Sequence, residues 1–585
     1  MTRTTADRTT DARSNRRQSD RRQSDRRQIE KIARESFGWD DLHTGQLEAV
    51  EAVLSGRNVL GVMPTGYGKS AIYQLSTALL DGLTLVISPL IALQEDQVAG
   101  LADAPDAPPA VALNSNRTAA ELDEAWSILE GEGPRIAFLA PEQLAKDEVI
   151  ERLQGIGVAL FVVDEAHCVS SWGHDFRPDY LFLGPAIERL GRPRVIALTA
   201  TGSSPVRREI AERLGLDDPL VLTRGFDRPN IRLDVARHES DGEKRAAVLD
   251  QVADLPKPGL LYVATRKASE VFAEELAERG ISTAAYHGGL SAKARAEVHE
   301  AFHEDTVDVV VATSAFGMGI DKPNVRFVVH AAVPESVDEY YQEVGRAGRD
   351  GEPAVAALHY RPEDLALQKF FTARTADRGR LRNVYRAVEA AGRPVRPAEI
   401  GRELELATRS VTGPVNLLAD AGVVATGRKG VSIVDPVGAD EAAERARQAA
   451  EEGERIERSR LEMMRAYAET RDCRRAFLLG YFGEERLTDC GNCDTCEARV
   501  EAATVLGVED PAPLDRGEVP ATEEQALEEA GDDDYPLQAA VTHREWGPGV
   551  VMRHEEDRIT VFFEQEGYKV LSRKLIEEND LLSVD

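Results

Sequence analysis

Residues 65–70 combine small, flexible and cationic residues in a pattern that suits phosphate binding. They read Thr-Gly-Tyr-Gly-Lys-Ser, follow the apolar segment 58–64 and precede a predicted helix. Backbone N–H groups in such a loop point at phosphate oxygens, and the N-terminus of the helix adds a partial positive charge. Lys69 can then reach the β- and γ-phosphates of a nucleotide such as ATP, and the Ser70 hydroxyl can hold Mg²⁺. The strict pattern has glycine where this chain has Met63, so a chance turn is the alternative. The predicted phosphate-binding residues are Thr65, Gly66, Gly68, Lys69 and Ser70.

Two carboxylates at the end of another apolar run supply the second half of such a site. The run 159–163 is followed directly by Asp164 and Glu165. A carboxylate at the C-terminal end of a strand beside a phosphate loop can bind Mg²⁺, so Asp164 is the predicted ligand, directly or through water. Glu165 is placed to polarise the water that attacks the γ-phosphate. The preceding run is buried in character, which argues against an exposed Asp-Glu pair.

Four of the five cysteines fall within 24 residues, in the spacing C-x16-C-x2-C-x2-C. They are Cys473, Cys490, Cys493 and Cys496. Four thiolates at this spacing suit a closed tetrahedral Zn²⁺ site with a structural role, and an iron–sulfur cluster is the chemical alternative. So few cysteines in so long a chain do not form a disulfide framework, and their clustering indicates a metal site in a reducing cytoplasm. Cys168 needs no ligand role.

The elements that must position these residues are short apolar runs that alternate with helical stretches. Runs rich in Val, Ile and Leu, separated by helices, predict parallel sheets covered on both faces. The fold class is therefore α/β, with a first lobe over residues 29–215 and a second over 216–365, joined near 216–235. The first set of runs is 58–64, 83–89, 135–141, 158–164 and 194–201, and the second is 259–265, 282–287, 307–313, 325–332 and 355–360.

The rest of the chain is predicted to hold smaller parts. Residues 376–436 show three helical patterns and a hairpin, which is a winged-helix pattern. A long helix and the cysteines occupy 439–498, and an acidic linker follows over 499–535. Residues 536–585 alternate polar and apolar positions and predict a small β-barrel. The Arg-rich residues 1–28 are low in complexity and are predicted to be a disordered tail.

The composition excludes some classes of protein. No run of about 18 apolar residues and no secretory signal is present, so we expect a cytoplasmic protein without a membrane span. The net charge of −31 would usually argue against a nucleic-acid partner, but a local basic groove can coexist with an acidic shell. A GC-rich genome explains 59 Arg beside 12 Lys but not the acidity, for which a high-salt cytoplasm is one explanation.

These motifs together resemble the RecQ family of superfamily-two helicases, over roughly residues 30–365 and 460–496. The matching segments are 63–70, 88–93, 164–167, 197–201, 312–323 and 341–351. The resemblance implies two RecA-like lobes and an ATP-dependent DNA helicase that moves 3′ to 5′. It also implies a role in DNA repair, recombination or replication. We expect the protein to be prokaryotic and to be associated with the nucleoid. Gln46, with Phe37 and Trp39, resembles the segment that reads adenine. Leu42 and His43 replace the family's usual aromatic-Arg pair there.

The resemblance also assigns roles to cations and aromatic residues. Cleavage of the γ-phosphate develops charge that a cation must neutralise, and Arg346 and Arg349 of the second lobe can reach the nucleotide when the lobes close. The segment after Glu165 resembles the family's aromatic-rich loop, whose rings stack on unpaired bases at about 1–3 kcal/mol each. Local packing is the alternative for these rings. The predicted residues for binding single-stranded DNA are Trp172, His174, Phe176 and Arg177.

The C-terminal half departs from the family pattern, because the winged-helix segment precedes the cysteines instead of following them. Its predicted recognition helix starts near Thr412, since Gly413-Pro414 would disrupt a helix interior. Arg409, Arg428 and Lys429 are the predicted contacts to the phosphates of a forked duplex, and a role in protein contact is the alternative. The segment around Trp546 resembles the Tudor-like barrel of some UvrD-type helicases and is a candidate site for a protein partner.

Three other functions share some of these residues. An RNA helicase shares Asp-Glu-Ala-His, but the zinc cysteines and the aromatic loop are not expected there. A DNA-binding regulator with a lapsed motor would not keep Lys69, Asp164, Glu165 and Arg349. An ATP-driven translocase that displaces proteins without strand separation fits the same residues, because no strand-separating element is identified.

Overall fold

The computed structural model describes most of the chain and divides it into two compact units. The described residues are 26–584 without 65, 90, 115–116, 171–176, 318–321, 366–376, 428–429, 485–487, 506–534, 536–538, 555–557, 564–565 and 580. The first unit comprises residues 1–360, 470–539 and 551–556, and the second comprises 361–469, 540–550 and 557–585. Residues 1–25 of the predicted tail and most of the predicted linker therefore lie outside the described residues. The last three residues of the predicted tail, 26–28, are helical, so the prediction of disorder is wrong there.

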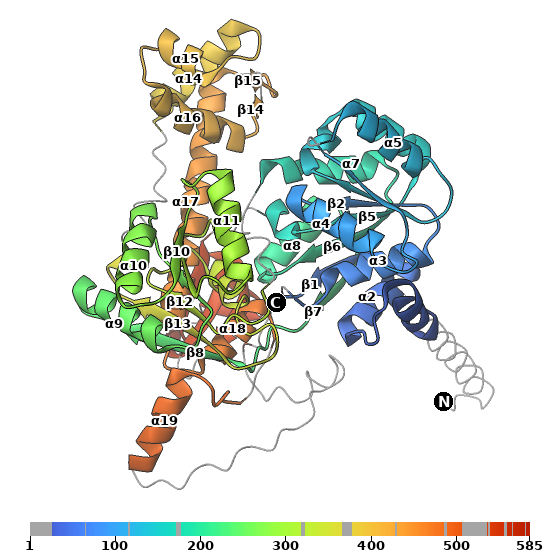
Figure 1. The fold of residues 1–585 in the computed structure, drawn as a ribbon. Helices are drawn as coiled ribbons and strands as arrows, with labels where there is room; N and C mark the ends of the chain where they lie inside the picture. Colours follow the sequence, from blue (N-terminus) through green and yellow to red (C-terminus); the bar gives the residue numbers. More distant parts are fainter. Residues whose placement is uncertain are drawn as a thin grey trace, which may run out of the picture. The chain divides into compact units, whose positions relative to one another are not determined.

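The first lobe is a parallel sheet of seven strands in the order β3-β4-β2-β5-β6-β1-β7, with helices on its faces (Figure 1). The strands are β1 (Val59–Val62), β2 (Leu83–Ile87), β3 (Ala110–Leu113), β4 (Arg135–Leu139), β5 (Val158–Val163), β6 (Arg194–Thr199) and β7 (Leu220–Thr223). The helices are α2 (Thr44–Leu54), α3 (Lys69–Leu79), α4 (Ile91–Ala102), α5 (Ala119–Leu129), α6 (Asp147–Ile156), α7 (Leu183–Arg189) and α8 (Ser204–Arg213). Every residue of β1, β2 and β4 is buried, because helices exclude water from both faces.

The predicted boundary between the lobes at residues 215 and 216 is wrong. Strand β7 pairs in parallel with β1, with Leu220 beside Val59, so the first sheet extends to Thr223. This strand lies at the edge of the sheet and is only partly buried, with Val221 47% exposed. A run of four residues on a half-exposed edge gives too weak an apolar signal to distinguish it from a connecting segment.

The second lobe is a six-stranded parallel sheet in the order β10-β11-β9-β12-β13-β8. Its strands are β8 (Ile231–Arg237), β9 (Gly259–Tyr262), β10 (Thr283–Tyr286), β11 (Val309–Ala312), β12 (Phe327–His330) and β13 (Ala354–Tyr360). Its helices are α9 (Asp241–Asp254), α10 (Arg266–Glu278), α11 (Ala292–His303) and α12 (Val337–Val344). All five predicted strands are present, and the strand that the sequence analysis did not predict, β8, is again at an edge.

The cysteine-rich segment, residues 470–505, belongs to the first unit. It contains α18 (Arg474–Phe482) and α19 (Asp494–Val505). Cys493 forms an isolated parallel bridge with Leu233 of β8, and the Leu233 N–H donates to the Asn492 carbonyl at 3.4 Å. The cysteine-rich segment therefore covers part of the edge strand β8, whose backbone would otherwise be open to pairing.

The second unit contains the predicted winged-helix elements and a long helix. These are α14 (Arg378–Ala391), α15 (Pro397–Glu403), α16 (Thr408–Asp420), the antiparallel hairpin β14 (Val424–Gly427) and β15 (Gly430–Ile433), and α17 (Ala439–Glu469). The prediction that α16 starts near Thr412 is wrong, because it starts at Thr408 and includes Pro414. Val411, Val415 and Leu418 are buried on one face of α16, and this packing keeps the helix continuous through the proline.

The C-terminal residues form a five-stranded antiparallel sheet where a small β-barrel was predicted. The elements are β16 (Ala540–His543), β17 (Gly547–His554), β18 (Arg558–Phe563), β19 (Gly567–Ser572), α21 (Arg573–Asn579) and β20 (Leu582–Val584), with the strand order β19-β18-β17-β16-β20. Strand β19 packs on α17, and the buried Tyr568 N–H donates to Ser459 Oγ at 2.7 Å.

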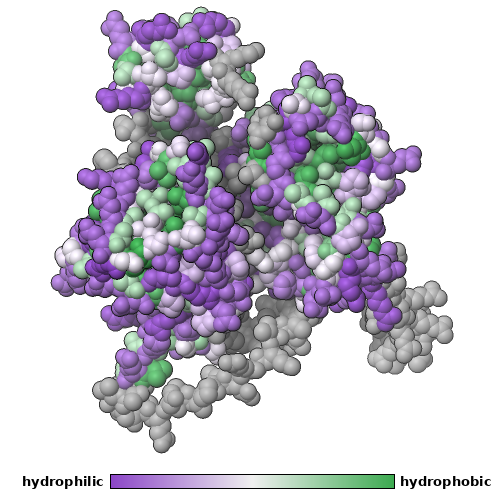
Figure 2. All heavy atoms as spheres, in the orientation of Figure 1, coloured by the Kyte–Doolittle hydropathy of each residue, from purple (hydrophilic) through white to green (hydrophobic). Residues whose placement is uncertain are grey.

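Hydrophilic residues cover most of the face drawn in Figure 2, with smaller apolar areas between them. Among the described helices, none combines the length and the apolar character that crossing a membrane requires.

Candidate nucleotide-binding site and cysteine cluster

The phosphate loop joins β1 to α3 through two glycines with left-handed backbone angles. Gly66 has φ +87° and Gly68 has φ +76°, and Gly68 is the N-cap of α3. The backbone angle of Gly68 favours glycine, and a Cβ there would also lie 2.6 Å from Gln46 Nε2, so the Gln46 amide would have to shift. Lys69 and Ser70 are therefore the first two residues of α3, where the helix N-terminus favours an anion. Thr65 lies outside the described residues.

The Lys69 side chain lies across the phosphate loop and bonds to the backbone that leads into it. Its Nζ donates to the carbonyls of Met63 at 3.0 Å and Pro64 at 3.4 Å. Burial lowers the pKa of Lys69, while the nearby Glu165 and Asp164 raise it. The structure thus brings together the lysine and the two carboxylates that the sequence analysis selected from separate segments.

Asp164 and Glu165 follow β5 directly. Burial and the charge of Glu165 raise the pKa of Asp164 to about 7, while Lys69 lowers it. Glu165 has φ +48°, a left-handed backbone angle that is uncommon outside glycine and asparagine. Backbone strain of this kind is found at functional sites, where the surrounding structure holds the residue.

A chain of polar contacts connects Glu165 to the segment 197–201. His167 Nδ1 lies 3.3 Å from Glu165 Oε2 and 2.9 Å from Thr199 Oγ1. Thr199 Oγ1 in turn donates to the Thr201 carbonyl at 2.7 Å. Burial lowers the pKa of His167 to about 3, so its imidazole is neutral at pH 7. Both segments match motifs of the family in sequence, but this connection depends on β5 and β6 being neighbours, which the sequence does not reveal.

The Gln46 amide bonds to the phosphate loop, so it is not available to an adenine base in this structure. Its Oε1 accepts the His43 N–H at 2.8 Å, and its Nε2 donates to the carbonyls of Tyr67 at 3.0 Å and Gly68 at 2.9 Å. The amide therefore links the start of α2 to the loop. Reading of adenine by Gln46 stays a prediction, and it would require these backbone contacts to be exchanged.

Arg346 and Arg349 lie just after α12 in the second lobe. Arg346 is 5% exposed and donates to the Gly317 carbonyl. Arg349 Nε donates to the Gly345 carbonyl at 3.4 Å, and its charge lowers the pKa of Lys69. Of the two, Arg349 is therefore the one whose charge acts on the phosphate loop in this structure, and Arg346 holds the loop that follows β11.

Most of the predicted DNA contacts lie outside the described residues. This applies to Trp172, His174 and Phe176 of the aromatic-rich loop and to Arg428 and Lys429 of the hairpin. Arg177 is half-buried, and its N–H donates to the Cys168 carbonyl at 3.0 Å. Arg409 is exposed on the first turn of α16.

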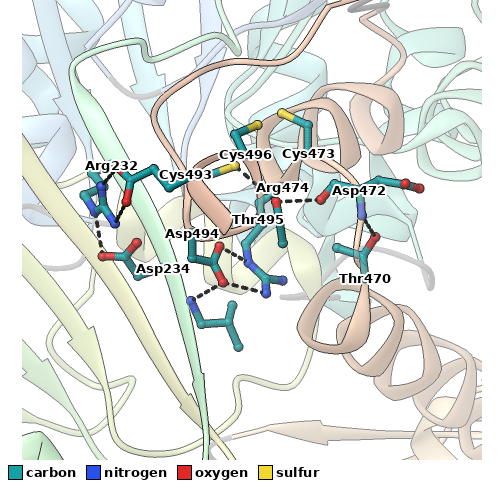
Figure 3. A network of polar contacts seen from close by, with 12 residues as sticks. Arg232, Asp234, Thr470, Asp472, Cys473, Arg474, Cys493, Asp494, Thr495 and Cys496 are labelled. Carbon is teal, nitrogen blue, oxygen red and sulfur yellow. Dashed lines mark hydrogen bonds and ion pairs between the residues drawn. The ribbon is translucent and has the colours of Figure 1, made fainter. Parts of the chain in front are cut away.

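The four predicted metal ligands are close together, and theirs is the only group found in the described ranges that could hold a metal ion. The sulfurs of Cys473, Cys490, Cys493 and Cys496 all lie within 4.8 Å of one another, and those of Cys490 and Cys496 are 3.9 Å apart. Figure 3 shows three of these residues, Cys473, Cys493 and Cys496. Tetrahedral Zn²⁺ with bonds of about 2.3 Å places its sulfur ligands about 3.8 Å apart, so the residues fit that ion. Cys168 is buried elsewhere.

Backbone donors and ion pairs surround the cysteine cluster. Cys490 Sγ accepts the Asn492 N–H at 3.3 Å. Beside it, Asp494 accepts two hydrogen bonds from Arg474, at 2.5 and 2.8 Å, and one from the Val235 N–H at 3.4 Å (Figure 3). These contacts tie the cluster to α18 on one side and to β8 on the other.

Comparisons with known proteins agree with this geometry. The model of the DEAD/DEAH box helicases matches residues 43–209, that of the helicase conserved C-terminal domain matches 243–351, and that of the RecQ zinc-binding domain matches 438–497.

Individual relatives match over long stretches. The chain is similar to the probable ATP-dependent DNA helicase RecS of Bacillus subtilis, with 40% identity over 345 residues, 58% of this chain and 68% of the relative. It is similar to the ATP-dependent DNA helicase RecQ of Haemophilus influenzae, with 35% identity over 466 residues, 80% of this chain and 63% of the relative. The solved structure of the helicase MrfA bound to DNA aligns with 71% of this chain and 63% of its own, at 18% identity and a TM-score of 0.48. The chain thus spans about two thirds of the length of these relatives.

Proposed function

The chain belongs to the RecQ family of ATP-dependent DNA helicases, and from that premise we propose that it moves 3′ to 5′ along single-stranded DNA and unwinds forked duplexes. DNA repair, recombination or replication is the process that such an activity would serve. The observation that supports the proposal most is the meeting of Lys69, Asp164 and Glu165 at the carboxyl ends of β1 and β5.

Each residue of this site has a proposed role in hydrolysis. Lys69 binds the β- and γ-phosphates, for which its contacts to the loop carbonyls would be exchanged. Glu165 accepts a proton from the attacking water, and the neutral His167 orients its carboxylate. Ser70 and Asp164 would hold Mg²⁺, which supplies positive charge to the phosphates.

The proposed role of the second lobe is to complete this site. Arg349, supported by Arg346, neutralises charge that develops on the γ-phosphate. Cycles of closing and opening of the lobes would then drive movement along a strand that Trp172, Phe176 and Arg177 contact. The cysteine cluster would bind structural Zn²⁺. Arg409 and the β14–β15 hairpin would contact the duplex. A protein partner at the C-terminal sheet and a place in the cytoplasm beside the nucleoid complete the proposal.

Unwinding measurements test the proposal directly. The substrates are a DNA fork with a 3′ tail, the same fork with a 5′ tail and an RNA duplex, each assayed at low and at high KCl. We expect ATP-dependent unwinding of the 3′-tailed fork alone. Unwinding of the RNA duplex would identify an RNA helicase instead, and hydrolysis stimulated by DNA without unwinding of any fork would identify a translocase.

Two variants test the site itself. Lys69→Ala should weaken nucleotide binding, and Glu165→Gln should abolish hydrolysis while it retains binding, because only the proton acceptor is lost. A Glu165→Gln protein with DNA-stimulated hydrolysis would contradict the role of that residue.

A further inference from the structure

The segment that joins the two lobes, residues 224–230, contains one deeply buried aromatic residue. It reads Arg-Gly-Phe-Asp-Arg-Pro-Asn and connects β7 to β8. Phe226 is 2% exposed. A connecting segment of this polar and turn-forming composition normally lies on the surface, so the burial of Phe226 requires partners from elsewhere in the chain.

The first half of this linker is attached to the phosphate loop. The Arg224 N–H donates to the Val62 carbonyl at 3.2 Å, at the end of the strand that leads into the loop. Gly225 has φ +82°, and a Cβ there would lie 2.7 Å from the ring of Tyr67. The linker therefore packs closely against a residue between the two loop glycines, and a shift of either one would move the other.

The second half of the linker is attached to the segment that carries the two arginines. Arg228 donates to the carbonyls of Ala347 and Gly348, both at 3.0 Å. Asn230 Nδ2 donates to the Gly348 carbonyl at 2.8 Å. These carbonyls lie between Arg346 and Arg349, so the linker sets the position of the backbone from which both side chains extend.

Phe226 lies between these two attachments, and two aromatic residues hold it. Its ring stacks on Phe482, the last residue of α18, at 4.5 Å between centroids and 14° between planes. The ring of Tyr341, from α12, lies 5.3 Å away, and its hydroxyl donates to the Phe226 carbonyl at 2.7 Å. The Phe226 N–H donates to Glu484 at 3.2 Å. Both the side chain and the backbone of Phe226 are thus fixed.

Helix α18 is itself anchored to both lobes. Arg475 is 4% exposed, pairs with Asp227 at 3.0 Å and donates to the Ile231 carbonyl at 2.6 Å. Arg207, from α8 of the first lobe, donates to the Phe482 carbonyl at 2.8 Å. The cysteine cluster lies at the other end of α18, where Cys473 is its N-cap.

We propose that Phe226 is a positioning residue for ATP hydrolysis. Helix α18 of the cysteine-rich segment holds Phe226, and Phe226 in turn keeps the phosphate loop aligned with residues 346–349, which carry the two arginines. The inference rests on the proposed hydrolysis of ATP. It gives the cysteine-rich segment a task in turnover in addition to stabilising the fold. Small misplacements of catalytic groups reduce rates by about tenfold to a hundredfold, whereas loss of packing alone reduces stability.

The test uses the whole chain of 585 residues and three variants: Phe226→Leu, Phe482→Leu and the control Phe272→Leu. Phe272 is also buried, 8% exposed, but lies in α10 within the core of the second lobe. Three quantities are measured for each variant: kcat with saturating single-stranded DNA, the Kd for a fluorescent ATP analogue, and Tm. We expect kcat to fall about tenfold or more in the first two variants, with Kd changed less than about twofold. The control should lose a similar Tm and keep its kcat.

A double variant and a milder one keep the test decisive. Phe226→Leu with Phe482→Leu should lose no more than the worse single variant, because both remove the same contact. If these chains do not fold, Tyr341→Phe removes only the hydroxyl and should still lower kcat without affecting Kd. Variants at Phe226 and Tyr341 that keep kcat and differ only in Tm, as the control does, would overturn the inference. A wild-type protein without DNA-stimulated hydrolysis would instead overturn the proposed function.

Discussion

Replacing Glu343 by Gln should stabilise the protein, and increasingly so as the pH rises. Glu343 lies in α12, three residues before Arg346, and is 5% exposed. Its Oε2 is 2.7 Å from His330 Nε2. Burial raises the pKa of Glu343 to about 8 and lowers that of His330 to about 3. At pH 7 both groups are therefore neutral, and the protonated carboxyl donates to the imidazole.

The size of the effect follows from proton linkage. An unfolded chain loses the Glu343 proton near pH 4.5, whereas the folded chain keeps it until about pH 8. In this window the folded state binds one more proton, so the free energy of unfolding falls by about 1.4 kcal/mol per pH unit. Unfolded His330 titrates near pH 6.5 and folded His330 near pH 3. The contribution of unfolded His330 is the same in the wild type and the variant, so the difference between them above pH 6.5 isolates Glu343. Gln does not titrate, so the free energy of unfolding of the variant should not fall in this way. Relative to that of the wild type, it should rise by about 2 kcal/mol between pH 6.5 and 8.

Urea denaturation at several pH values between 6.5 and 8 measures this difference. Gln can donate its amide to the same His330 nitrogen, so packing should be retained. Glu335→Gln is a graded comparison, because Glu335 is an exposed carboxylate near the start of the same helix whose charge raises the pKa of Glu343. Its difference from the wild type should therefore rise with pH in the same direction but less than that of Glu343→Gln. A flat difference for Glu343→Gln would mean that Glu343 is ionised in the folded protein and paired with Arg346.

Three further predictions concern the metal site and the DNA contacts. Elemental analysis should find one Zn²⁺ per chain, and Cys490→Ser should reduce solubility more than turnover per folded molecule; a brown protein with visible absorbance would indicate an iron–sulfur cluster instead. Trp172→Ala should leave DNA binding largely intact but remove the stimulation of hydrolysis by single-stranded DNA, and unchanged stimulation would mean that the loop only packs. Arg428→Ala with Lys429→Ala should weaken binding to forked duplexes of any sequence and lower the salt slope by about one to two units. Equal losses on single strands, or none on either substrate, would exclude the hairpin as the duplex contact.

The sequence was sufficient to predict the buried strands of both lobes, because helices cover both faces of a parallel sheet and leave long apolar runs. It was not sufficient for three of the four edge strands, β3, β7 and β8. In β8, Ile231 and Leu233 are buried while Arg232 and Asp234 are half-buried, so the run alternates and is not continuous. Its inner edge pairs with β13 and its outer edge meets the cysteine-rich segment, and neither partner is near in sequence.

In the candidate site, too, the sequence predicts some contacts and not others. Lys69, Asp164 and Glu165 each stand at the end of an apolar run, and parallel strands end at one edge, so their meeting was predictable. The hydrogen bonds of Gln46 to the loop carbonyls were not predictable, because an amide at that position can bond to a base as well as to backbone carbonyls. The contact between His167 and Thr199 required the order of β5 and β6, which the sequence does not specify.

The burial of Phe226 is the clearest case of a functional contact that periodicity cannot predict. Apolar periodicity identifies residues that face the core of their own helix or strand, and Phe226 belongs to neither. One signal was nevertheless present: Phe226 is an isolated aromatic residue in a segment that otherwise consists of Arg, Gly, Asp, Pro and Asn. Leaving such a ring in water would cost about 2 kcal/mol relative to burying it, so a neighbouring element must cover it. In this chain α18 covers it, which explains why a cysteine-rich segment far along the sequence lies against the linker between the lobes.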